Sequence, residues 1–207
     1  MLSYYAITPP VTGWLEIDLE KEIVDYLWKQ IDKSTVSVKD QLAGHISSSF
    51  ALEDEEEYFQ RNVLQEAANK YSESFSASTG YRNVNHVSSG NGLALNGFWV
   101  NYQKKHEFNP PHDHGGLFSF VVWMKIPTDS EEQKKLDFLK GTIKPIVSNF
   151  DMNYIDTTGG VASYIYEMSP KMEGKMLFFP SKFKHAVYPF YESDDDRITI
   201  SGNLYYA

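Results

Sequence analysis

The chain has 207 residues, of which 42 % are hydrophobic and 15 % aromatic, so its composition excludes an intrinsically disordered protein. Its net charge of −9 at pH 7 makes nucleic acid an improbable partner. It has no cysteine, so any bound metal must be held by nitrogen and oxygen ligands. No apolar run approaches the ~20 residues that cross a bilayer, and no basic and apolar leader is visible, so we expect a cytoplasmic protein without a membrane partner.

The first 80 residues contain two segments with helical periodicity. The segment IDLEKEIVDYLWKQIDK, residues 17–33, places four aliphatic side chains on one face, and Asp18 is its expected N-cap. Residues 54–75 repeat the pattern, with apolar residues three and four positions apart. Between them, residues 39–54 are expected to form a connection with short extended pieces. We therefore interpret residues 1–80 as a helical support region.

The second part of the chain, residues 81–207, has the character of a β-rich core. Its short segments are rich in β-branched and aromatic residues and are separated by Gly, Pro, Asn and Asp, as is typical of strands. One helical insertion is expected near 130–141, because SEEQKKLDFLKG opens with a serine and ends at a glycine. The residues predict a single domain, 1–207, with helices packed on a β-sandwich or barrel.

A pair of histidines lies in the stretch NPPHDHGG, residues 109–116. Because residues i and i+2 of a strand share a face, His112 and His114 would point to one place and Asp113 away from it. A metal site needs a third ligand, and the best candidate is His185, which opens a late strand. The remaining histidines are weaker candidates: His45, His86 and His106. Taken alone, the pattern fits hydrogen-bonded structural histidines as well as it fits a metal site.

A second pattern follows 12 residues after His185 (197 − 185), where Arg197 begins a strand and Thr199 shares its face. A guanidinium offers two parallel donors and a neighbouring hydroxyl offers a third, so the two side chains could bind a carboxylate. The alternative is an ion pair between the arginine and the acidic turn at residues 194–196.

Together, H-x-[DH], a distant His and R-x-[ST] about ten residues later resemble the signature of the iron(II)- and 2-oxoglutarate-dependent oxygenases. The segments WVNYQKKHEFNPPHDHGGLFSFVVWMKIP, GKMLFFPSKFKHAVYPF, RITISGN and LAGHISSSFAL are most similar to such oxygenases of bacteria and of phages of marine cyanobacteria. The resemblance implies an α+β fold, a double-stranded β-helix of jelly-roll or cupin-like type with flanking N-terminal helices. A phage-encoded member would act in the host cytoplasm.

The resemblance also implies an activity and a set of site residues. His112, His114 and His185 would hold catalytic Fe(II), and Arg197 and Thr199 would bind the distal carboxylate of 2-oxoglutarate. With dioxygen, the enzyme would hydroxylate a C–H bond of a peptide or small-molecule substrate and release succinate and CO2. The usual triad has two histidines and one carboxylate, so a histidine at position 114 leaves the metal one negative charge short.

Two other classes of protein remain alternatives. A metal-binding cupin shares the H-x-H pattern and the spacing from Gly174 to His185, but it calls for a glutamate where Phe118 and Ser119 stand. A non-catalytic β-sandwich interaction protein with a degenerate metal site would account for the missing carboxylate.

Overall fold

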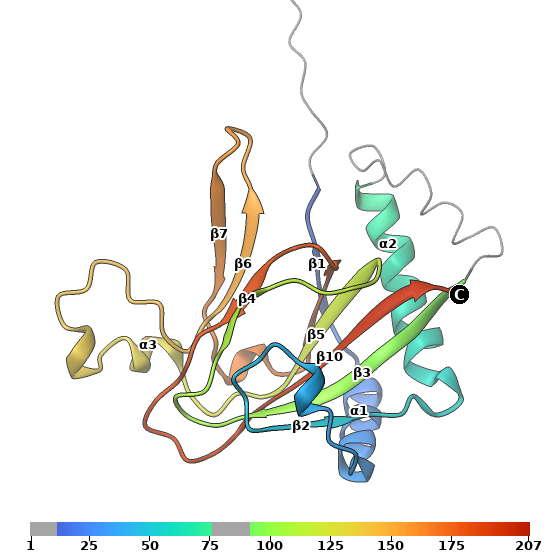
Figure 1. The fold of residues 1–207 in the computed structure, drawn as a ribbon, viewed down its shortest axis with the longest axis horizontal. Helices are drawn as coiled ribbons and strands as arrows, with labels where there is room; N and C mark the ends of the chain where they lie inside the picture. Colours follow the sequence, from blue (N-terminus) through green and yellow to red (C-terminus); the bar gives the residue numbers. More distant parts are fainter. Residues whose placement is uncertain (1–11, 76–91) are drawn as a thin grey trace, which may run out of the picture.

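The computed structural model describes residues 12–75 and 92–207, in which two antiparallel sheets face each other (Figure 1). The larger sheet has six strands in the order β1-β8-β5-β10-β3-β2, and the smaller has four in the order β4-β9-β6-β7. This is the double-stranded β-helix that the resemblance implied. Within the described residues, no helix has the length and apolar character needed to cross a membrane.

The strands are short apart from two long ones in the middle of the larger sheet, β3 and β10. Their bounds are β1 (Leu15–Asp18), β2 (Ser48–Ala51), β3 (Leu93–Gln103), β4 (Asn109–His112), β5 (Phe118–Lys125), β6 (Phe150–Ile155), β7 (Val161–Tyr166), β8 (Lys175–Pro180), β9 (His185–Val187) and β10 (Arg197–Tyr206). The helical elements are α1 (Lys21–Lys33), η1 (Lys39–Gln41), η2 (Glu55–Glu57), η3 (Gln60–Leu64), α2 (Gln65–Phe75), α3 (Ser130–Gln133), η5 (Asp137–Leu139) and η6 (Pro170–Met172).

Helices α1 and α2 cover the outer face of the larger sheet (Figure 1). The aliphatic face of α1 is buried there through Ile23, Leu27 and Ile31, as the 3.6-residue period predicts. On the sheet side, Phe178 of β8 is fully buried in the same cluster. Removing an aromatic side chain from such a position costs about 3–5 kcal/mol of stability.

A second apolar cluster lies between the two sheets and joins β5 and β8 to β6 and β7. Trp123 of β5 is 1 % exposed, and its ring meets Phe150 and Tyr166 at centroid distances of 5.7 and 5.6 Å. This cluster holds the sheets together, and several of its residues, among them Val121, Trp123 and Phe150, also line the cavity between the sheets.

The strand β10 contributes side chains both to the helix-facing core and to the cavity. Ile200 and Leu204 are fully buried in the helix-facing core, whereas Thr199, Ser201 and Asn203 line the cavity on the opposite face. Because alternate residues of a strand point to opposite faces, the apolar residues of β10 face the core and the polar ones face the cavity.

The helical interpretation of residues 1–80 was incomplete, because this region also contributes β1 to the larger sheet. β2, which joins the same sheet, lies within residues 39–54, where short extended pieces were expected. The expected N-cap was wrong: Asp18 ends β1, where Lys175 lies opposite it and donates to its carboxylate at 2.6 Å, and Glu20 occupies the N-cap position. The helical insertion near 130–141 is also shorter than expected, since α3 ends at Gln133 and only a 3-10 turn follows.

Candidate active site

The three histidines come from β4, the turn after it and β9. His112 ends β4 and lies directly opposite His185, the first residue of the neighbouring strand β9. His114 follows the strand end, and its backbone N–H donates to the carbonyl of Ser181 at 2.9 Å. The candidate ligand atoms of the three side chains all lie within 4.8 Å of one another. Two adjacent strands and one turn therefore bring residues 71 positions apart (185 − 114) into one cluster.

The imidazole rings are oriented so that their Nε2 atoms remain available. The Nδ1 of His112 lies 2.8 Å from the carbonyl oxygen of Pro110, and the Nδ1 of His185 lies 3.1 Å from that of Phe183. Because a carbonyl can only accept, both Nδ1 atoms carry the hydrogen, and both Nε2 atoms present a lone pair. The Nε2 atoms of His114 and His185 are 3.2 Å apart, close to the roughly 3.0–3.4 Å that bonds of about 2.1 Å to a shared metal require.

Burial keeps two of these rings neutral, as metal binding requires. His185 is 5 % exposed, and burial followed by its two histidine neighbours holds the pKa of this ring well below its usual range. Burial, and secondarily the neighbouring His112, lowers the pKa of His114 to about 4. The ring of Phe150 also stacks on His185 at 5.5 Å, which restricts its rotation.

Arg197, at the start of β10, is a buried cation with only neutral partners. It is 1 % exposed, and its NH2 group donates to the backbone carbonyl and to the hydroxyl of Ser148, both at 2.7 Å. Its NH1 makes a long bond of 3.4 Å to Gln103, and its Nε has no hydrogen-bond partner among the residues that the structure describes. Burial lowers the pKa of Arg197 to about 9, so the group stays charged at neutral pH. A buried cation with an unused donor favours a bound anion.

The acidic turn before β10 does not supply that anion. Asp194 pairs with Lys105 at 2.6 Å and Asp195 with Lys125 at 3.3 Å, all near the surface. No ion pair of Arg197 occurs within the described residues. The alternative interpretation of the arginine, an ion pair with the residues just before it, is therefore wrong.

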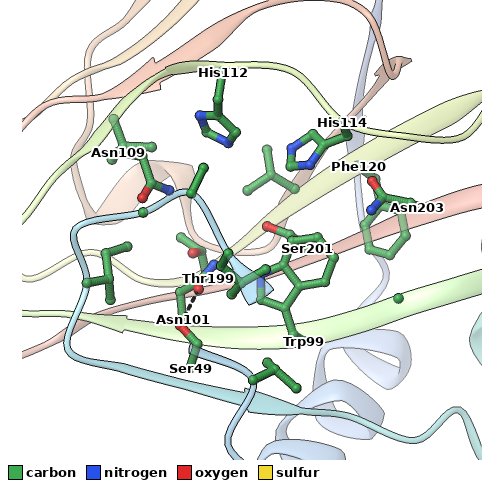
Figure 2. A pocket seen from close by; sticks show the side chains of 18 of the residues that line it. Ser49, Trp99, Asn101, Asn109, His112, His114, Phe120, Thr199, Ser201 and Asn203 are labelled. Carbon is green, nitrogen blue, oxygen red and sulfur yellow. Dashed lines mark hydrogen bonds between the residues drawn. The ribbon is translucent and has the colours of Figure 1, made fainter. Parts of the chain in front are cut away.

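One cavity of about 670 Å³ contains the histidines, Arg197 and Thr199. Figure 2 shows His112 and His114 on one side of it, facing Trp99 and Thr199 on the opposite wall. Thr199 is half-buried and lies opposite Asn101 of β3. The cavity thus joins the three-histidine cluster to the buried cation.

The other candidate residues lie elsewhere. His45 packs against Phe108 at 4.6 Å, and His106 packs against Tyr191 at 5.1 Å. His86 lies outside the described residues. Asp113 pairs with the exposed Lys182 at 3.2 Å and is not part of the histidine cluster.

Sequence reasoning missed residues that hold Arg197 in place and residues that line the cavity. Ser148 and Gln103, which hold Arg197, lie 49 and 94 positions away from it, and no local pattern connects them. The continued alternation of RITISGNLY could have identified two further cavity residues, Ser201 and Asn203.

The double-stranded β-helix brings a three-histidine cluster, which could hold a metal ion, and a buried arginine into one cavity. Residues 97–203, just over half of the chain, match the family model described as "Putative 2OG-Fe(II) oxygenase". The chain belongs to this 2OG-Fe(II) oxygenase family, whose cofactors are Fe(II) and 2-oxoglutarate and whose further cosubstrate is dioxygen. The membership decides against the cupin alternative.

Solved structures agree with the fold. A prolyl-4-hydroxylase of Pseudomonas putida aligns with a TM-score of 0.51 and 13 % identity over 95 % of this chain and 94 % of that chain. The non-haem α-ketoglutarate-dependent epimerase SnoN from nogalamycin biosynthesis aligns with a TM-score of 0.50 and 13 % identity, over 95 % of this chain and 77 % of that chain. No curated protein matches the chain.

Proposed function

We propose that this chain is an Fe(II)- and 2-oxoglutarate-dependent dioxygenase that hydroxylates a C–H bond of a peptide or small-molecule substrate. The observation that carries the proposal is the presence, in one cavity, of three convergent imidazoles and a buried arginine that lacks an anionic partner. We also propose that residues 1–207 act as one domain, since β1 and β2 complete the larger sheet.

In this proposal His112, His114 and His185 are the metal ligands. Two of them are held by Nδ1–H bonds to backbone carbonyls, so their Nε2 lone pairs face the metal position without further rearrangement of the rings. Three neutral imidazoles supply no negative charge, so the metal retains its full double charge until an anionic cosubstrate binds.

Arg197 and Thr199 would bind the distal carboxylate of 2-oxoglutarate. The unpartnered Nε and the weakly engaged NH1 of Arg197 are the donors that remain after Ser148 has taken NH2. When bound, Fe(II) and 2-oxoglutarate activate dioxygen, so that one oxygen atom enters the substrate C–H bond, the other enters succinate, and CO2 is released. The aromatic wall around Trp99, which is 7 % exposed, limits access of water.

The experiment is to measure Fe(II)-dependent conversion of 2-oxoglutarate to succinate, together with anaerobic Fe(II) binding. His112→Ala and His185→Ala should each abolish both. The matched control is His106→Asn, since this histidine is exposed and outside the cavity. No succinate formation by the Fe(II)-supplied wild type would refute the proposal and favour a non-catalytic protein with a degenerate site. Succinate formation that survives both triad substitutions would refute the assignment of the metal ligands.

A further inference from the structure

We propose that Asn203 positions the primary substrate, by donating from its side-chain NH2 to the carbonyl oxygen of an uncharged amide. The inference deepens the proposed function and rests on it, because it takes 2-oxoglutarate to occupy the Arg197 end of the cavity. Asn203 lies near the opposite end of β10, on the side of the cavity where His114 lies (Figure 2).

The length of β10 separates the two ends. Its cavity-lining residues alternate along the strand: Arg197, Thr199, Ser201, Asn203 and Tyr205. At ~3.3 Å per residue, the backbone of Asn203 lies about 20 Å from that of Arg197. A five-carbon diacid bound at the arginine is much shorter than this distance. The outer part of the wall is therefore free to contact a different molecule.

The carbonyl oxygen of Asn203 is held by a buried chain of two hydroxyl groups. The Oγ of Ser119 lies 2.7 Å from Asn203 Oδ1 and 2.8 Å from the Oγ of Ser181. The hydroxyl of Ser119 donates to Asn203 Oδ1, because an amide oxygen can only accept. Both serines are at most 1 % exposed. The bond from Ser119 holds the amide oxygen of Asn203 toward the buried serines and leaves the NH2 group on the other side.

The NH2 group of Asn203 is left as a directed donor. Its Nδ2 has no hydrogen-bond partner within the described part of the chain. It faces Gly97, where a Cβ would lie 3.6 Å from it, so the absence of a side chain at that position keeps the donor accessible. A donor that is fixed and unpaired before the ligand arrives loses little entropy on binding.

The surroundings of this donor select an uncharged acceptor. Its cavity-lining neighbours Trp99, Ser201 and Tyr205 carry no charge, and the nearby Asp113 is paired with Lys182. An ammonium group would meet an NH2 donor here, and a carboxylate would lose water without gaining a cation. A carbonyl of an amide needs only the hydrogen bond, and Trp99 offers the adjoining apolar surface.

The test substitution is Asn203→Asp, which keeps the shape and the acceptor for Ser119 but replaces the donor with a charged acceptor. The matched control is Asn153→Asp on β6, a half-buried asparagine that donates to Ser163 at 3.0 Å and does not line the cavity. Probes are the N-acetyl N-methylamides of alanine and leucine, the two free amino acids, and an acetylated, amidated alanine octapeptide. Each is titrated by ligand-detected NMR into full-length protein loaded with Zn(II) and 2-oxoglutarate.

We expect the blocked amides to bind the wild type and Asn153→Asp with equal affinity. They should bind Asn203→Asp at least tenfold more weakly, which corresponds to about 1.4 kcal/mol. The free amino acids should bind more weakly than the blocked forms. Tighter binding of the octapeptide would identify polypeptide as the source of the amide, and equal binding would identify a small amide.

Ser119→Ala, which releases the amide oxygen without changing Asn203, should produce a smaller loss of affinity. Equal affinities of wild type and Asn203→Asp, or no binding of any blocked amide to wild type, would overturn the assignment. The affinity for 2-oxoglutarate, measured in parallel, should be the same in both proteins. If the wild type does not bind 2-oxoglutarate, that result would instead contradict the proposed function.

Discussion

Replacement of Arg197 tests the cosubstrate site most directly, because this cation is buried and its partners are neutral. The NH2 of Arg197 is engaged by Ser148, so Nε and NH1 are the donors left for a carboxylate. A charge-assisted hydrogen bond contributes about 1.5–3 kcal/mol. Arg197→Lys keeps the charge but loses the planar pair of donors. Loss of one such bond weakens 2-oxoglutarate binding roughly 10- to 150-fold, at about 1.4 kcal/mol per tenfold.

The assay is anaerobic 2-oxoglutarate binding to the Mn(II)-loaded protein, with thermal unfolding as a second readout. At a concentration 100 times its Kd, the ligand stabilises the wild type by about 2.7 kcal/mol. For a chain of this size, that corresponds to a rise in Tm of roughly 5–11 °C. The same concentration should give a smaller rise for Arg197→Lys and almost none for Arg197→Met.

The control is Arg61→Lys on the exposed face of η3. Thr199→Ala, which removes only the hydroxyl donor, should cost less than either substitution at Arg197. If Arg197→Met is folded and binds 2-oxoglutarate as wild type does, the assignment of the carboxylate site is refuted.

Two further predictions concern the metal ligands and the core. His114→Asp should retain or increase Fe(II) affinity in a direct titration, since a carboxylate restores the usual charge, whereas Asp113→Asn should change it little because Asp113 is paired with Lys182 outside the cluster. A loss of Fe(II) binding in Asp113→Asn would show that the ligand assignment is mistaken. Phe178→Ala should lower the free energy of unfolding in urea by about 3–5 kcal/mol, because this ring is fully buried under α1 and α2; a loss below 1 kcal/mol would contradict the packing described.

Local alternation explains why much of the cavity could be predicted from the sequence. The spacing of His112 and His114 indicated a shared direction, and the spacing of Arg197 and Thr199 indicated a shared face, because side chains of a strand alternate over a two-residue period. The same period placed Ile200 in the core. His114 lies in the turn after β4 and not in the strand, but it still joins the cluster because its backbone N–H is bonded to Ser181.

The sequence by itself determined the periodicities of the helices and strands. It also indicated which three histidines, and which arginine at the start of β10, were candidates for the cavity. Only the tertiary structure decided which partners meet them. Pairing of β4 with β9 sets His112 opposite His185, and the segment before β6 brings Ser148 to Arg197. The structure also decided that β1 and β2 join the larger sheet, although they lie among helices in the sequence. The physical reason is that a strand's hydrogen bonds are completed by a different strand, whose position in the chain its own residues do not encode.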